Sequence, residues 1–116
     1  MSEFRTPEEV LLHHGEAVEA ADLDAIVADY SDDAVFITPQ AVLRGKDGVR
    51  QGFTQLLGDL PQAEWQTALQ IGGNVAFMQW SAVSARAVAN DGVDTFVFRD
   101  GMICAQTICY TLETRR

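Results

Sequence analysis

The stretch GVDTFVFRDG, residues 92–101, decides how the rest of this chain is interpreted. Its alternation of polar and apolar residues, closed by Asp100-Gly101, predicts a β-strand that ends in a tight turn. Side chains two apart on a strand lie on one face, so Asp94, Phe96 and Phe98 share a face. The Asp94 carboxyl group therefore lies beside either a pocket or solvent. In a pocket, burial penalises the charged form and raises its pKa.

Further strands are predicted on both sides of this stretch. Strand-forming residues span 64–71, 75–87 and 102–112, and the joints between the strands fall at residues 72–74, 90–92 and 100–101. These joints have the Gly, Asn and Asp residues of hairpin turns, which connect antiparallel neighbours. The second half of the chain is therefore predicted to be an antiparallel meander.

The first half carries helix signals. Thr6-Pro7-Glu8-Glu9 has the N-cap, the proline and the glutamate of a capping box. His14 falls on the apolar stripe of this first helix, whereas His13 points off the stripe, toward the surface. The stripe is formed by Val10, Leu11, Ala17, Val18 and Ala21. Asp22 is suited to cap a second, shorter helix, which carries Leu23, Ile26, Val27 and Tyr30.

A short mixed region is predicted between these helices and the meander. Residues 31–33 predict a turn, residues 34–38 a short strand stopped by Pro39, and residues 44–48 a loop into a third helix. The apolar face of that helix is formed by Val49, Phe53, Leu56 and Leu57. Helices followed by a meander predict an α+β fold, with the helices on one face of the sheet.

Length and charge exclude several classes of partner. The 116 residues fit a single domain, residues 1–116, with a hydrophobic fraction of 47% and a formal net charge of −9. Lys and Arg number only eight and form no basic run, so we expect neither a nucleic-acid partner nor a membrane surface. We find no apolar segment of the kind that makes a membrane span or a secretory signal.

The cysteines and the absence of ligand motifs bear on location and cofactors. Cys104 and Cys109 lie five apart in one predicted strand, on opposite faces and about 16 Å apart, too far for a disulfide. Free cysteines without a signal favour a cytoplasmic location. The spacings of a metal site, a P-loop and a dinucleotide site are missing, so we expect no metal and no cofactor.

Four segments carry a resemblance to a known family: ADLDAIV (21–27), YSDDAVF (30–36), RGKDGVR (44–50) and VDTFVFRDGMI (93–103). In this order and spacing, the chain resembles the nuclear transport factor 2-like (NTF2-like) superfamily, in particular its SnoaL-like and ketosteroid-isomerase-like branch. The resemblance covers nearly the whole chain. It implies a cone-shaped, cystatin-like α+β fold, in which three N-terminal helices pack on a strongly curved, mixed or antiparallel sheet. It also implies a ligand pocket and a homodimer.

The resemblance further implies site residues. Ketosteroid isomerases use a carboxylate base and an oxyanion hole made by a tyrosine and a protonated aspartic acid. By position, Asp94 corresponds to that acid, His14 to the tyrosine and Thr38 to the base. Thr38 departs from the pattern, because a hydroxyl group has no useful basicity near neutral pH. Asp94 and His14 are thus the candidate catalytic residues, acting without a cofactor on a small, hydrophobic, carbonyl-bearing ligand.

Other side chains are candidates for ligand contact: Thr38, Gln106, Tyr30, Phe36, Phe53, Trp80, Phe96 and Tyr110. Plainer interpretations stay open beside these. Asp94 can be a solvated carboxylate, His14 a core histidine and Gln106 half of a cross-strand polar pair. Three functions also stay open: a cofactor-free isomerase, dehydratase or cyclase, a ligand binder that has lost the base, and a dimerisation module.

Overall fold

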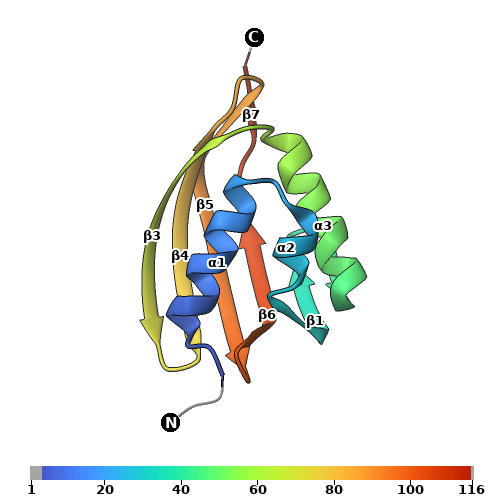
Figure 1. The fold of residues 1–116 in the computed structure, drawn as a ribbon. Coiled ribbons are helices and arrows are strands. Elements are labelled where there is room, and N and C mark those ends of the chain that lie inside the picture. Colours follow the sequence, from blue (N-terminus) through green and yellow to red (C-terminus); the bar gives the residue numbers. More distant parts are fainter. Residues whose placement is uncertain (1–3, 116) are drawn as a thin grey trace.

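A computed structural model describes residues 4–115, in which three helices lie against one curved sheet of seven strands (Figure 1). The sheet bends around α1, while α3 packs on β1. The helices are α1 (Pro7–Glu19), α2 (Leu23–Val27) and α3 (Gly45–Asp59). The strands are β1 (Tyr30–Ile37), β2 (Val42–Arg44), β3 (Glu64–Gly72), β4 (Val75–Val83), β5 (Ala87–Arg99), β6 (Met102–Cys109) and β7 (Glu113–Thr114).

The sheet is mixed. Its strand order is β2-β1-β6-β5-β4-β3, with β7 paired to β5. The pairing of β1 with β6 is parallel, and the other pairings are antiparallel. This arrangement confirms the predicted α+β class with a strongly curved mixed sheet.

The two predicted helix starts are confirmed. The Thr6 hydroxyl accepts from the Glu9 backbone N–H, while the Glu9 carboxylate accepts from the Thr6 backbone N–H at 2.9 Å. Asp22 caps α2 by accepting from the Ala25 N–H at 3.1 Å. The buried face of α1 carries Val10, Leu11, His14 and Ala17. His14 points inward because it lies on this mostly apolar stripe.

Three predictions about the middle of the chain are wrong. Tyr30 does not continue α2, and residues 31–33 are not a free turn, because β1 already begins at Tyr30. Tyr30 pairs with Ile103 of β6, and the register shifts before Val35. Residues 31–33 therefore lie within an irregular stretch of β1, between two residues that pair with β6. Residues 44–48 are likewise not a loop, because α3 begins at Gly45.

The predicted hairpin at Asn90-Asp91-Gly92 is also wrong, because these residues lie inside β5. Trp80 pairs with Gly92 and Ala82 with Ala89, so two steps on β4 match three on β5. The extra residue is a β-bulge, which bends a strand and re-aims its side chains. The true turn follows β4 earlier, where the Ser84 N–H donates to the Ala87 carbonyl at 2.9 Å. The bulge leaves Ala89 and Asp94 both buried, although they are five positions apart, a spacing that puts side chains on opposite faces of a regular strand.

The C-terminal part of the sheet differs slightly from the prediction. β6 ends at Cys109, three residues before the predicted limit of 112. Cys104 and Cys109 are both free thiols. Among residues 4–115, no helix combines the length and the apolar character needed to cross a membrane.

Candidate functional site

A cavity of about 310 Å³ opens between α1 and the inner face of β3, β4 and β5. Asp94 and His14, the two candidate catalytic residues, both line it. The other lining residues are Leu11, Leu12, Gly15, Glu16, Val18, Glu19, Phe53, Leu56, Trp65, Thr67, Met78 and Trp80. The wall is mostly apolar, and none of its lining residues within 4–115 is a Lys or Arg. A hydrophobic molecule with a few polar atoms suits a cavity of this kind.

Asp94 is 5% exposed, so its carboxyl group faces the cavity rather than bulk solvent. Trp80 Nε1 donates to Asp94 Oδ1 at 2.9 Å, and Gln106 Nε2 donates to Asp94 Oδ2 at 3.0 Å. Burial raises the pKa of Asp94 to about 7, against the opposing effect of these two hydrogen bonds. Near neutral pH the carboxyl group therefore populates both its acid and its anionic form.

Tyr30 and Gln106 extend this network away from the cavity. The Tyr30 hydroxyl donates to Gln106 Oε1, and both side chains are almost completely buried. Burial, followed by the negative charges of Asp94 and Asp29, raises the pKa of Tyr30 well above its ordinary value. Tyr30 thus keeps its proton, and a chain of neutral donors runs from Tyr30 through Gln106 to Asp94.

His14 lies on the inner face of α1, where its ring contacts three aromatic rings. Its ring meets Phe53 at 5.4 Å, Phe96 at 5.6 Å and Tyr30 at 6.0 Å between centroids, all edge-on. Burial lowers the pKa of His14 to about 4, so the imidazole is neutral at pH 7. Its Nδ1 is buried and has no hydrogen-bond partner among residues 4–115. A neutral imidazole with an unpartnered Nδ1, in a residue that lines the same cavity as Asp94, leaves hydrogen-bonding capacity for a ligand.

Trp80 forms part of the cavity wall and is held between two other aromatic rings. Its indole meets Trp65 at 5.4 Å and Tyr110 at 5.3 Å. On its remaining side it packs on Gly92, where a Cβ atom would lie 2.1 Å from the indole ring. Gly92 is required because the Trp80 ring occupies the space of a side chain. This packing aims the indole N–H at Asp94.

Thr38, the position of the family's base, lies elsewhere. It lines a second cavity of about 290 Å³, together with Phe36 and Tyr110 and between α3 and the β1–β2 connection. The Thr38 hydroxyl accepts from the backbone N–H groups of Gln40 at 3.1 Å and Ala41 at 3.0 Å. Thr38 therefore stabilises a turn. The three positions of the isomerase pattern do not share one cavity: His14 and Asp94 line the first cavity, and Thr38 lines the second.

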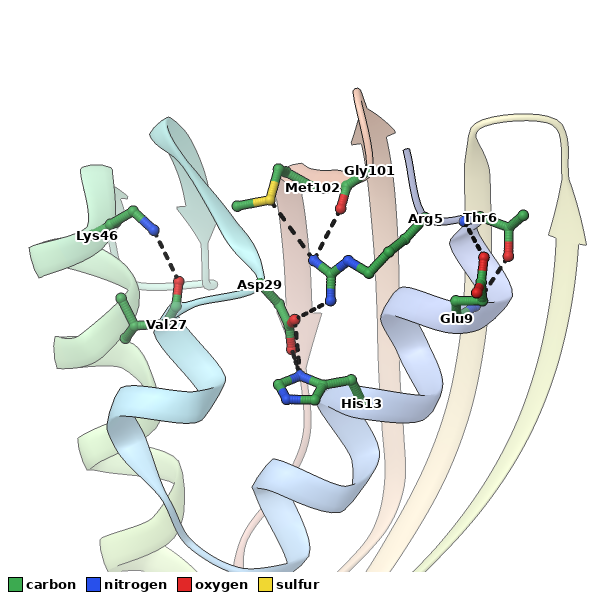
Figure 2. Close-up of polar contacts among 9 residues, drawn as sticks. All are labelled: Arg5, Thr6, Glu9, His13, Val27, Asp29, Lys46, Gly101 and Met102. Atoms are coloured by element: carbon green, nitrogen blue, oxygen red, sulfur yellow. Dashed lines mark hydrogen bonds and ion pairs between the residues drawn. The ribbon is translucent and has the colours of Figure 1, made fainter. Parts of the chain in front are cut away.

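Sequence reasoning missed a second buried carboxylate, Asp29, which lies just after α2 and is 1% exposed. Arg5 donates to Asp29 Oδ1 at 2.8 Å, and His13 Nδ1 lies 2.7 Å from Asp29 Oδ2 (Figure 2). His13 does point off the α1 stripe, but its half-exposed ring is held by this carboxylate. The available signal was an acid flanked by buried residues, Val27 and Tyr30. The partners lie too far away in sequence for local reasoning to find them.

Three inner strand residues of the cavity wall, Trp65, Thr67 and Met78, were also not predicted. Their period-two spacing with one another and with Trp80 was the usable signal. They lie on the same inner face as Asp94, since Met78 pairs directly with Asp94 across β4 and β5.

The profile of the SnoaL-like domain family matches residues 12–106 of this chain. No functionally curated protein sequence matches it. The matched segment contains His14, Thr38 and Asp94, so it spans all three positions of the isomerase pattern.

Solved structures share the fold at low sequence identity. An NTF2-like protein of unknown function from Burkholderia xenovorans LB400 is 24% identical, with 90% of this chain and 81% of that chain covered and a TM-score of 0.76. A provisionally assigned ketosteroid isomerase from Kribbella flavida DSM 17836 is 13% identical, with 88% and 75% covered and a TM-score of 0.73. A de novo designed protein with a curved β-sheet is 14% identical, with 92% and 88% covered and a TM-score of 0.77. At these identities the likeness shows the fold alone.

Proposed function

This chain belongs to the SnoaL-like domain family, and we propose that it binds a small hydrophobic, carbonyl-bearing molecule in the Asp94 cavity and acts on it as a cofactor-free isomerase, dehydratase or cyclase. The supporting observation is the environment of Asp94: a buried carboxyl group with a pKa of about 7, on an apolar wall without a lysine or arginine. Groups whose pKa lies near the working pH are the most effective acids and bases.

In an isomerisation of this type, a proton leaves the carbon next to a carbonyl group and its electron pair moves onto the carbonyl oxygen. The resulting enolate takes the proton back at another carbon. The acid form of Asp94 donates a hydrogen bond to the developing oxyanion. His14, which is neutral at pH 7, is the second donor or the group that carries the proton between carbons. Gln106 orients the carboxyl group, and Phe53 and Trp80 form apolar walls against the ligand.

The test uses a simple β,γ-unsaturated ketone, cyclohex-3-enone, whose conversion to cyclohex-2-enone is followed by ultraviolet absorbance. One oxyanion donor contributes about 3 kcal/mol to lowering the barrier, so Asp94→Leu should reduce kcat/KM by about a hundredfold or more. Asp32→Leu, at an exposed carboxyl group on β1, is the matched control and should leave the rate unchanged. Because the acid form is the donor, the rate should fall as the pH rises through about 7. A rate that Asp94→Leu leaves intact contradicts the assignment.

A second candidate function, ligand binding without catalysis, is favoured by one observation. Thr38 stands at the base position, and its hydroxyl is used by the turn at Gln40 and Ala41. A binder of this kind should be stabilised by 2-naphthol, a flat phenol, through a rise in Tm that Asp94→Leu abolishes. It should show no turnover of the unsaturated ketone. If the protein neither binds 2-naphthol nor converts the ketone, a dimerisation module is the remaining one of the three functions.

We also propose that the chain forms a homodimer through the outer face of its sheet. On this face, two rows of residues that pair with one another across β3, β4, β5, β6 and β1 contain no charged side chain. Charged residues make up 22% of the whole sequence. The rows are Gln70, Phe77, Thr95, Thr107 and Ile37, and Gly72, Val75, Val97, Ala105 and Val35. Phe77 and Val75 are each 42% exposed, and a second copy would bury them. Sedimentation should give a dimer that Phe77→Lys dissociates, and a wild-type monomer contradicts the proposal.

A further inference from the structure

The hydrogen-bond chain that ends on Asp94 begins outside the cavity. Neither Tyr30 nor Gln106 lines the cavity, and both are at most 1% exposed. Tyr30 comes from the first residue of β1, Gln106 from β6 and Asp94 from β5. Gln106 can reach both of the others because β6 lies between β1 and β5 in the sheet. A chain of buried polar side chains across three strands is costly, because each side chain loses its hydration on folding. We therefore ask what this chain of hydrogen bonds does for Asp94.

The hydrogen-bond chain from Tyr30 to Asp94 has a fixed direction of donation. A tyrosine hydroxyl has one proton, and the Tyr30 proton is donated to Gln106 Oε1. With its oxygen engaged, the amide turns its NH₂ group to Asp94, where Nε2 donates to Oδ2 at 3.0 Å. An NH₂ group facing a carboxyl oxygen stabilises the anion. The opposite orientation would place Oε1 against Asp94, and an oxygen there can be satisfied only by a protonated carboxyl group.

We propose that the Tyr30 hydroxyl is a positioning group for the site: by locking the orientation of the Gln106 amide, it sets how readily Asp94 holds its proton. This inference rests on the proposed role of Asp94 as the acid group of the cavity. Tyr30 touches no ligand and acts only through Gln106. Without its hydroxyl, the two amide orientations become comparable, and the flipped one accepts a hydrogen bond from protonated Asp94.

The other groups around Asp94 do not perform this function. On α1, His14 is neutral at pH 7, and Glu16 and Glu19 are exposed at the cavity wall. The cavity-lining residues of β3, β4 and α3 are uncharged. Tyr110, after β6, donates its hydroxyl proton to Asp59 at 2.9 Å and has its pKa raised, chiefly by burial. Tyr110 is thus a second phenol near Asp94, but it does not belong to the hydrogen-bond chain that runs from Tyr30 to Asp94.

The test follows the Asp94 carboxyl carbon by NMR in the full-length, ¹³C-labelled protein from pH 4 to 9. Tyr30→Phe should raise the measured pKa of Asp94 by about one unit, a tenfold change in proton affinity. Gln106→Leu should raise it at least as much. The double variant should match Gln106→Leu alone, because Tyr30 acts through Gln106. The matched control, Tyr110→Phe, should leave the Asp94 pKa within a few tenths of a unit.

A wild-type measurement serves if the variants do not fold. The ¹⁵N shift of the Gln106 side chain should titrate with the midpoint of Asp94, because its NH₂ group reports on the carboxylate. An unchanged Asp94 pKa in Tyr30→Phe, additive effects in the double variant, or a pH-independent Gln106 shift would each overturn the inference. None of these readouts requires turnover. A shifted pKa with no conversion of cyclohex-3-enone therefore sinks the proposed function and leaves the role of Tyr30 standing.

Discussion

Two buried aspartates of this molecule are compensated in opposite ways. Asp29, 1% exposed, faces the guanidinium of Arg5 and the ring of His13 (Figure 2). Asp94, 5% exposed, accepts hydrogen bonds from two neutral donors, Trp80 and Gln106. Asp29 is thus hydrogen-bonded to a cationic side chain, whereas burial beside neutral donors raises the pKa of Asp94 to about 7.

The surroundings of the two carboxyl groups match this difference. Arg5 also donates to the Gly101 carbonyl at 3.0 Å, so the Asp29 cluster ties the segment before α1 to the β5–β6 turn. Asp94 instead lies on the wall of a cavity. Asp29 is therefore a structural acid and Asp94 the chemically adaptable one. Changing each in turn should separate stability from proton chemistry.

The largest expected effect is the pH dependence of the stability that Asp94 contributes. Its folded pKa, about 7, is raised above the ordinary 3.8, so its contribution is complete below pH 3.8 and lost as the pH rises to about 7. The loss amounts to up to about 4 kcal/mol. His14 has the opposite sign, because its pKa falls from 6.5 to about 4 and its contribution is lost as the pH falls through that window.

Urea unfolding of the wild type, Asp94→Leu and His14→Phe between pH 4 and 7 measures both slopes. The stability advantage of the wild type over Asp94→Leu should shrink as the pH rises. Its advantage over His14→Phe should grow, by about 3 kcal/mol up to pH 6.5. Curves for the three proteins that stay parallel would mean that neither group has a shifted pKa.

The next effect belongs to Asp29. Asp29→Ala removes an acceptor from Arg5 and His13 and should lower the free energy of unfolding by about 2–3 kcal/mol. The control is Asp33→Ala, which breaks the exposed ion pair with Arg99 and should cost less than about 1 kcal/mol. Urea unfolding at pH 7 compares the two. Equal costs would remove the distinction between a buried and a surface carboxylate.

A smaller effect is expected at Gly92. Gly92→Ala places a Cβ atom against the Trp80 ring, and overpacking of this kind costs about 2 kcal/mol. Displacing the indole should also weaken its hydrogen bond to Asp94 and raise the Asp94 pKa. Gly58→Ala on α3, where no atom lies within 4 Å of the added Cβ, should not destabilise the protein. Thermal unfolding and the Asp94 titration check both statements, and a stable Gly92→Ala with an unmoved Trp80 goes against them.

The smallest effect is expected at Thr38. Thr38→Val removes the acceptor used by Gln40 and Ala41 and should cost about 1 kcal/mol. Binding of 2-naphthol in the Asp94 cavity should not change, because Thr38 lines the other cavity. Thermal unfolding with and without 2-naphthol gives both quantities. A loss of naphthol binding would contradict this and show that Thr38 contributes to binding in the Asp94 cavity.

The elements that the sequence predicted are those fixed by local chemistry. The capping box at Thr6 predicted the start of α1, and its apolar stripe predicted that His14 points inward. The period-two pattern placed Asp94 with Phe96 and Phe98. The bulge at 90–92 was not predictable, because Asn-Asp-Gly suits a bulge and a hairpin equally. What separates the two is pairing with β4, which is a long-range property.

The polar partners of the site were beyond local reasoning for the same reason. Gln106 was predicted as a ligand contact or as half of a cross-strand polar pair, but its link to Tyr30 joins residues 76 positions apart. Tyr30 itself was placed on a helix, because nothing local indicates that β1 pairs with β6 at that residue. Asp29 and Arg5, 24 residues apart, likewise meet only in the folded chain.

The most direct measurement for the whole account is the ¹³C titration of the Asp94 carboxyl carbon in the wild-type protein. We expect a midpoint near pH 7, far above that of the exposed carboxyl groups. A midpoint at or below about 4, the ordinary range for aspartate, would contradict the claim that this cavity holds an acid able to change its charge near neutrality.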